Sequence, residues 1–445
     1  MRAQHKQHEG QEHMCQGVQG GGEVAAGAET REDLTEISCM QGFQKKATGV
    51  LNGIAELPVI SADGAPIQIG RNKLYRGKRR VREIAQVKNI IGDLPPPGGP
   101  TALEGVTFLD DLEGGGSIID WDALPASCDP RRFLQSKDPS TSGRAMRKRW
   151  QVESFCLLLR RLLSTPQRQK VVDFGCGTGC LVVPLAHLFP AHQFVGLDMK
   201  AQALRILEDR ALAAGVQNLS TVLCMVEHYD EPFDVSLALH ACGNATDHAL
   251  LQAQRRRAAY IVSPCCVGKL KFSMAGGPSF RSRRTKRERG VATVCDGQGK
   301  DAAQREGRAQ RTPQVRHPRS QWMRTALREP EQQFKLLAKI GDFALSTAST
   351  PTALEEDAET VSRLCKLHLE IDRNEAAKEV GYRVGLFKAI HHDRMAKGDV
   401  LAGVPEERIE WQEVWAPLFC PPSPRPSHLV TAVMSESHVG PQDPV

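Results

Sequence analysis

The sequence lacks the features of a membrane or secreted protein. No apolar run among its 445 residues approaches the roughly 18–20 residues that span a bilayer. The polar start, MRAQHKQHEG, has no apolar core of the kind that directs secretion, so we expect no signal peptide. The 13 cysteines form no regular framework, and we expect reduced thiols. The default location is therefore the cytoplasm, with the nucleus or a plastid as alternatives.

Aromatic residues are scarce, with 14 Phe, 5 Trp and 4 Tyr, whereas 39 Gly and 27 Pro predict much loop. Of the 58 basic and 52 acidic residues, 12 and 4 fall within 276–320, which leaves 46 and 48 elsewhere. This basic segment has no apolar period and predicts a disordered insert. Three interpretations of this segment are open: an RNA-binding arm, a solvated loop, or a translated stretch of retained intron. A second basic cluster, at 71–88, predicts an amphipathic helix with Val81, Ile84 and Val87 turned inward.

Changes in composition divide the chain into segments. We expect residues 1–50 to be disordered and residues 51–143 to form a loosely ordered extension, which PPPGGP and GGGS interrupt. Residues 144–405 have the pattern of a domain, interrupted by the basic insert at about 274–316. Residues 406–445 predict a mostly disordered tail.

Short apolar strands alternate with helices inside 144–405. Strands are expected at 170–174, 193–197, 220–226, 233–239 and 258–262, and helices at 144–162, 180–188, 201–214, 247–257, 332–339 and 360–379. This alternation predicts a doubly wound, mostly parallel α/β sheet with helices on both faces. A late strand is expected at 382–389, with 344–345 as one candidate partner.

A glycine-rich loop, DFGCGTG, follows the first expected strand and precedes a helix. Its glycines allow a tight turn and a close approach of backbone to ligand. The loop lacks the third glycine of a dinucleotide-binding fingerprint, because position 180 is Cys. Asp173 can accept a hydrogen bond from an ammonium group, but it would repel a pyrophosphate. A ligand with an amino-acid moiety and a ribose fits better, which predicts S-adenosylmethionine as the cofactor.

A second carboxylate, Asp198, ends the next expected strand, where it would bind both hydroxyls of the ribose. A structural turn and a nicotinamide site are the alternatives to this interpretation. The residues that we expect to bind the cofactor are Asp173, Gly175, Cys176, Gly177, Gly179, Asp198, Met199, Glu227 and His240.

Two further strand ends carry unusual residues, LHACGNATD at 239–247 and SPCCVGK at 263–269. Ligands bind outside the carboxyl ends of parallel strands, so both segments should border the same pocket. The candidate catalytic residues are His240, as general base, Cys265 and Cys266. Three roles are possible for these cysteines: metal binding, contact with the substrate through a thiol, and packing. We expect no metal, because these ends hold no CxxC pair and adjacent cysteines rarely chelate one ion. Thr246 and Asp247 would cap the following helix.

These motifs resemble the class I methyltransferase domain of the glutathione S-transferase C-terminal-domain-containing protein family and its plant and algal relatives. The resemblance rests on VVDFGCGTG, FDVSLALHACGNATD, SPCCVGKLKFS, HPRSQW and EIDRNEAAKEVGYRVGL, and it covers about residues 145–273 and 316–405. The HACGNATD segment is also similar to that of tRNA methyltransferases that modify a ribose 2′-oxygen. The resemblance implies a Rossmann-like fold of the class I methyltransferase type. Two departures are the absence of a glutathione-transferase-like helical pattern before residue 140 and the insert between KLKFS and HPRSQW.

The function predicted from these features is S-adenosylmethionine-dependent methylation of RNA, with a tRNA-like substrate. Basic clusters at 71–88, 144–149 and 281–289 support an RNA partner. We expect no membrane or DNA partner, and the sequence does not predict the oligomeric state. The alternatives are a methyltransferase for a protein or small molecule, and a non-catalytic binding protein on the same scaffold.

Overall fold

The computed structural model describes residues 78–95, 106–112, 118–133, 139–272, 274, 315–342, 353–395 and 398–419, which all belong to one compact unit. The predicted disordered segment at 1–50, nearly all of the insert and the end of the tail lie outside these residues. Among the helices of the described ranges, none is long and apolar enough to cross a bilayer.

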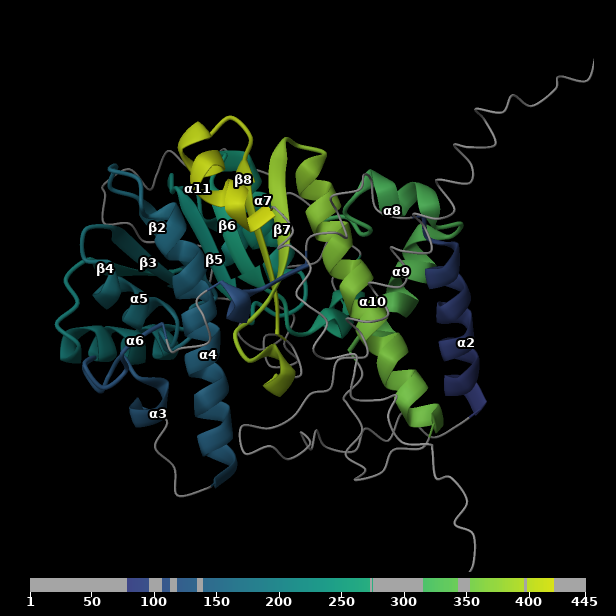
Figure 1. Cartoon of the computed structure of the whole chain (residues 1–445), viewed down its shortest axis with the longest axis horizontal. Helices are drawn as coiled ribbons and strands as arrows, with labels where there is room; N and C mark the ends of the chain where they lie inside the picture. The colour runs from purple at the N-terminus through teal and green to yellow at the C-terminus, as the bar shows by residue number, and fades with distance from the viewer. Residues whose placement is uncertain are drawn as a thin grey trace, which may run out of the picture. The chain divides into compact units, whose positions relative to one another are not determined.

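A single sheet of eight strands forms the centre of the described structure (Figure 1). Its order is β1-β7-β8-β6-β5-β2-β3-β4. The strands are β1 (Val106–Phe108), β2 (Lys170–Phe174), β3 (Gln193–Asp198), β4 (Leu219–Leu223), β5 (Val235–Leu239), β6 (Ala259–Ser263), β7 (Tyr382–Lys388) and β8 (Asp399–Pro405). β8 pairs antiparallel with β6 and β7, and every other pair is parallel. The predicted mostly parallel sheet is confirmed.

Helices cover both faces of this sheet, as the alternating pattern predicted. They are α2 (Lys78–Asp93), α3 (Pro130–Phe133), α4 (Pro139–Leu162), α5 (Val182–Leu188), α6 (Ala201–Ala213), α7 (Ala245–Arg256), α8 (Gln321–Ala326), α9 (Pro330–Ile340), α10 (Ala353–Lys378) and α11 (Ile409–Phe419). One buried cluster joins α4, α5, α6 and α11 to the first face, and a second joins α7 and α10 to the other. A third cluster packs α2, α8 and α9 against α10, and Figure 1 shows α2 and α9 beside α10.

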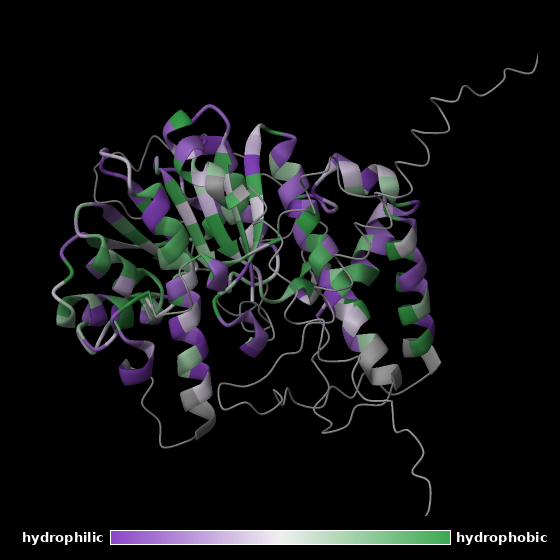
Figure 2. Ribbon diagram, viewed as in Figure 1, coloured by the Kyte–Doolittle hydropathy of each residue, from purple (hydrophilic) through white to green (hydrophobic). Residues whose placement is uncertain are grey.

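Apolar residues concentrate where these elements meet, and the strands are mostly hydrophobic in Figure 2. Trp150, Phe155 and Leu162 of α4 are buried. Burial involves more than a single face of this helix, because every residue from 151 to 159 is buried. The segment 118–133 and α11 also pack against α4, with Trp121, Trp411 and Trp415 in the same buried cluster.

The predicted helix at 71–88 is α2, which begins at Lys78 within the described residues and ends at Asp93. Ile84 and Val87 are buried as predicted, but the prediction that Val81 turns inward is wrong, because this residue is 48 % exposed. The buried positions run from Glu83 through Leu94, so the neighbouring helices cover the later turns of α2 and leave Val81 in solvent.

Several boundaries differ from the sequence-based expectation. The expected loose extension over 51–143 contains α2, the start of α4 and β1, which pairs with β7 at the edge of the sheet. The first part of the expected disordered tail forms α11, with Trp411 and Trp415 fully buried. The late strand β7 pairs with β1 and with the unpredicted β8, and residues 344–345 lie outside the described ranges. The strand expected at 220–226 ends at Leu223, and Val226–His228 forms a 3-10 turn, η4.

Candidate active site

The glycine loop after β2 adopts a backbone that glycine alone adopts readily. Gly175, Gly177 and Gly179 have φ of 77°, 55° and 79°. A Cβ on Gly175 or Gly177 would meet no described atom within 4 Å, so these two residues leave open space above the bend. A Cβ on Gly179 would lie 2.8 Å from Leu207 and Val183, so this glycine is needed for packing. The first two glycines therefore form a surface that a ligand can approach.

Hydrogen bonds hold the loop against β3 and α6. The N–H groups of Gly175 and Cys176 donate to the carbonyl of Leu197, at 2.8 and 3.0 Å. The buried guanidinium of Arg210 in α6 donates to the carbonyl of Thr178 at 2.7 Å. The Cys176 side chain is buried and lies against Gly196 of β3, where an added Cβ would be 3.2 Å from its sulfur. Cys176 therefore contributes to the site through its backbone.

Asp173 is buried at the carboxyl end of β2, with 1 % of its surface exposed. No described group donates a hydrogen bond to its Oδ2 atom. Burial, and to a lesser extent nearby Asp198, raises the pKa of this carboxyl to about 7, and Lys148 partly opposes both effects. A buried acceptor without a donor is costly, so a ligand ammonium group beside Oδ2 would satisfy it and favour ionisation.

Asp198 ends β3, the strand paired directly with β2, so the two predicted carboxylates share one edge of the sheet. Its Oδ2 accepts the Gly177 N–H at 3.0 Å, and its Oδ1 accepts the Lys200 N–H at 2.9 Å. Each carboxylate oxygen has a second lone pair, so both oxygens can still accept hydrogen bonds from a ribose diol. The two carboxylates therefore lie at the same edge of the sheet, beside the glycine loop.

The other predicted cofactor residues lie at neighbouring strand ends. Met199 is half-buried directly after Asp198. Glu227 is buried in η4, after β4, and its carboxylate interacts electrostatically with His248 of α7. His240 is half-buried directly after β5, in a left-handed conformation with φ of 62°. Its N–H donates to the carbonyl of Ser263 at the end of β6, at 3.3 Å, which joins the two strand ends.

Helix α4 contributes two residues that the sequence analysis did not identify as site residues. The Gln151 side-chain oxygen lies 3.1 Å from Nε2 of His240. One helical turn earlier, Lys148 interacts electrostatically with Asp173 and Cys265, and burial lowers the pKa of its ammonium. The three-residue spacing that places both on one side of the helix is visible in the sequence, but which elements that side contacts is not.

Three cysteines meet at the ends of β5 and β6. The sulfurs of Cys242 and Cys265 are 3.6 Å apart, and those of Cys265 and Cys266 are 3.5 Å apart. Hydrogen bonds from Cys265 and Cys266, together with Lys269, lower the pKa of Cys242, while the same contacts raise that of Cys265. The predicted residues Cys265 and Cys266 are thus together in the site, and Cys242 joins them.

Thr246 and Asp247 do not cap α7 as predicted. The N-cap is Asn244, the Thr246 hydroxyl donates to the carbonyl of Ala241 at 2.6 Å, and Asp247 is fully buried in an ion pair. Arg373 of α10 donates two hydrogen bonds to the Asp247 carboxylate, both at 2.9 Å. Arg319 also contacts Asp247, and its own N–H donates to Asp372 at 2.7 Å. These residues fix α7 and α10 to the segment before α8.

The basic cluster at 144–149 is only partly available to a partner. Arg149 forms two hydrogen bonds with the buried carboxylate of Asp129, at 2.8 and 2.5 Å, and lies over the Trp121 ring. Lys148 is half-buried in the site, whereas Arg144 is exposed. Among described residues of the 71–88 cluster, Arg82 and Lys88 are exposed. The segment 281–289 lies outside the described residues.

Residues 147–272 match a family model described as a methyltransferase domain. Together with the strand order and the glycine loop after β2, this match defines a class I methyltransferase domain. The chain is similar to the glutathione S-transferase C-terminal domain-containing protein of Bos taurus, at 24 % identity over 287 residues. That match covers 64 % of this chain and 37 % of the relative, so the chain spans well under half of the relative's length. The chain therefore contains a class I methyltransferase domain and is similar in sequence to these proteins, as the resemblance implied.

Two further similarities concern shorter or more distant matches. The ribosomal RNA small subunit methyltransferase G of Psychromonas ingrahamii is 38 % identical over 72 residues, which is 16 % of this chain and 35 % of that protein. The structure of magnesium protoporphyrin IX methyltransferase from Synechocystis PCC 6803 with bound SAM is 20 % identical and covers 30 % of this chain and 67 % of that one. Its TM-score is 0.24, so the fold assignment rests on the strand order and the family model instead.

Proposed function

We propose that the chain is an S-adenosylmethionine-dependent methyltransferase that acts on RNA. The observation that carries the donor assignment is the buried Oδ2 atom of Asp173, which no described group satisfies, beside the open glycine bend. A dinucleotide would place a pyrophosphate against this carboxylate, whereas the methyl donor would place an ammonium group there.

The residues of the loop fit each part of that donor. Asp173 would accept hydrogen bonds from the ammonium group, and the open backbone at Gly175 and Gly177 would lie against the amino-acid moiety. Asp198 would accept hydrogen bonds from the ribose hydroxyls. The bound donor supplies an electrophilic methyl group, and the protein's task is to hold the acceptor in line with it.

In this proposal His240 would remove a proton from a hydroxyl acceptor. Its Nε2 lies 3.1 Å from the side-chain oxygen of Gln151, which favours a proton on Nε2 and leaves Nδ1 as the basic nitrogen. Gln151 is then a positioning residue, because it fixes the tautomer of the base. A general base of this kind contributes about 10²–10⁴-fold to the rate when the acceptor is a hydroxyl.

Two observations support RNA as the acceptor. One relative, over 72 residues, is named as a ribosomal RNA methyltransferase. The described surface also presents Arg82, Lys88 and Arg144 to solvent, and basic side chains of this kind contact phosphates. Transfer to a protein or small molecule remains the alternative, since the donor site is the same for all of these acceptors.

The test combines donor binding with the location of transferred label. Purified full-length chain is titrated with S-adenosylmethionine by calorimetry, and then incubated with labelled donor and either total RNA or RNase-treated protein extract. We expect the chain to bind the donor and to transfer label to the RNA fraction. RNase treatment should remove this label, and His240→Ala should reduce it. Label confined to protein would support the alternative acceptor, and the absence of donor binding would overturn the proposal.

A further inference from the structure

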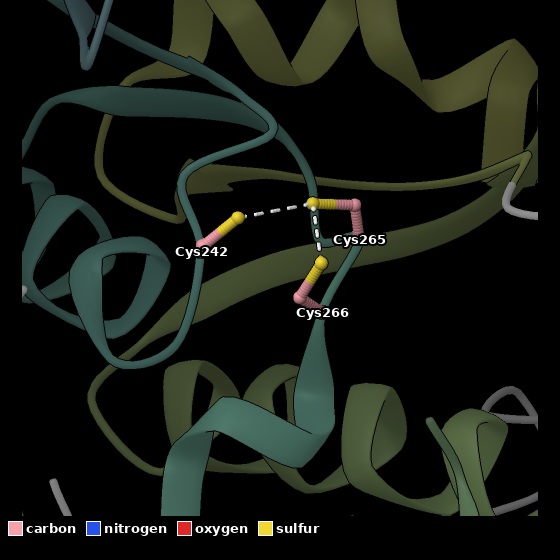
Figure 3. A group of neighbouring side chains, drawn as sticks. All are labelled: Cys242, Cys265 and Cys266. Atoms are coloured by element: carbon pink, nitrogen blue, oxygen red, sulfur yellow. Dashed lines mark hydrogen bonds between the residues drawn. The ribbon is translucent and has the colours of Figure 1, made fainter. Parts of the chain in front are cut away.

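The three cysteines at the ends of β5 and β6 have the geometry of a metal site. Figure 3 shows the Cys242 side chain directed toward Cys265, with the sulfur of Cys266 on the same side. All three sulfurs lie within 4.8 Å of one another. Neighbouring residues of a strand point to opposite faces, but β6 ends at Ser263, so Cys265 and Cys266 lie beyond the strand and need not follow this alternation. Both adjacent cysteines can therefore present their sulfurs to one point, which the sequence analysis did not expect.

The spacing matches what one zinc ion requires. With Zn–S bonds of about 2.3 Å, tetrahedral ligation places the sulfurs about 3.8 Å apart. Two of the three sulfur–sulfur separations are 3.6 and 3.5 Å and the third is at most 4.8 Å, so side-chain rotations can bring all three sulfurs to one ion. The three cysteines come from two loops, one after β5 with Cys242 and one after β6 with Cys265 and Cys266, so the site needs no CxxC motif.

The two loops hold the cysteines in place before any metal arrives. The Ser263 hydroxyl donates to the carbonyl of Asp399 in β8 at 2.8 Å, and the Ser263 carbonyl accepts the His240 N–H. The loops also touch at Gly243, where an added Cβ would be 3.4 Å from Cβ of Lys269. Ligands on such supported strand ends lose little freedom on binding a metal.

The local charge suits three thiolates and one divalent cation, which together carry a net charge of −1. The ammonium of Lys269 interacts with Cys242 and can neutralise that charge. Cys242 and Cys266 are half-buried, so an ion among the three sulfurs can be reached from solvent.

We infer that Cys242, Cys265 and Cys266 bind one Zn²⁺ ion as thiolates and leave its fourth position to a non-protein ligand. On binding, three Zn–S bonds form and the thiols release their protons to solvent, with no change in oxidation state. Three protein ligands with an open fourth position is the arrangement of catalytic zinc sites. One of its ligands, Cys242, follows His240 by two residues in the sequence.

The experiment measures metal content without any methyl transfer. Full-length chain is reduced, stripped with a chelator, loaded with Zn²⁺ and desalted, and its zinc content is compared with that of Cys242→Ser, Cys265→Ser and Cys266→Ser. The matched control is Cys224→Ser, which replaces a buried thiol at the end of β4. A second measurement replaces zinc by Co²⁺ and records thiolate-to-cobalt charge-transfer absorption, which reports thiolate ligation directly. Circular dichroism shows whether each variant is folded.

We expect about one zinc ion bound per chain through these residues, lost in each of the three variants and retained in the control. The cobalt absorption should fall with each ligand removed. Zinc content that is equal in all four variants would overturn the inference, because other cysteines would then hold the ion. Iron with acid-labile sulfide, or a reduced protein that binds no zinc but readily forms a Cys242–Cys265 disulfide, would overturn it too. None of these results depends on the acceptor or on donor binding.

Discussion

Replacing Asp173 with Asn should stabilise the protein and remove donor binding at the same time. The pKa of this carboxyl rises from 3.8 to about 7 in the fold, mainly through burial. An acid whose pKa is raised on folding is harder to ionise in the native state, so it destabilises the fold once the pH exceeds its unfolded value. Asparagine keeps the size and removes the charge, so that penalty disappears.

The magnitude follows from the pKa difference of about three units, each worth about 1.36 kcal/mol. The upper bound on the gain is about 4 kcal/mol near pH 8, and less than half of that near pH 5, where the native carboxyl stays protonated. Urea unfolding of both proteins at the two pH values measures the gain, and calorimetry at pH 8 measures donor affinity. Asp234→Asn is the control, because its carboxylate accepts the Lys170 N–H at the other end of β2. That variant should bind donor normally.

The reasoning about Asp173 makes two separate claims that the data can refute. A stability change that is the same at both pH values would show that burial does not oppose ionisation of this carboxyl. Unchanged donor affinity in Asp173→Asn would show that the unsatisfied oxygen does not face the ammonium group, and the donor-site assignment would fail with it.

Three further predictions follow from the same contacts. Gly177→Ala should lower the free energy of unfolding by only about 1 kcal/mol but block donor binding. Gly179→Ala should lower it by about 2–4 kcal/mol, because the added Cβ would lie 2.8 Å from two side chains. Urea unfolding and donor titration of both variants test this, and equal stabilities would contradict it. Asp247→Asn should destabilise by about 3–5 kcal/mol, since it leaves the Arg373 guanidinium buried without its charge partner, and a loss below about 1 kcal/mol in urea would refute the pairing argument. Donor affinity should rise as the pH increases toward about 7 and Asp173 ionises; calorimetry that shows constant affinity between about pH 5.5 and 7.5 would contradict that pKa.

Local pattern was enough to predict that Asp173, the glycine loop and Asp198 lie close together. The alternation of strands and helices places β2 and β3 side by side, and Asp173 and Asp198 then share one edge of the sheet. The glycine loop carries its own conformational signal, because all three glycines have positive φ. These features depend on residues close together in the chain, so pattern and spacing suffice.

Features that depend on distant packing could not be predicted in the same way. β8 is buried at every position and so shows no alternation, and its pairing with β6 joins residues far apart in the sequence. The sulfur of Cys242 meets that of Cys265 because β5 and β6 pair, but the side-chain directions at their ends follow from how each loop turns. Lys148 and Gln151 reach the site only because α4 crosses the sheet where it does.

The sequence strings on which the resemblance to the glutathione S-transferase C-terminal-domain-containing protein family rests have two different physical roles. DFGCGTG forms the surface on which we propose the donor binds. NATD, HPRS and EIDRN meet in one buried network, through Asp247 with Arg373 and through Arg319 with Asp372. That network fixes helices to one another, so these strings are evidence about the scaffold. Under the proposed function, the choice of acceptor should instead depend on the residues around His240 and the three thiols.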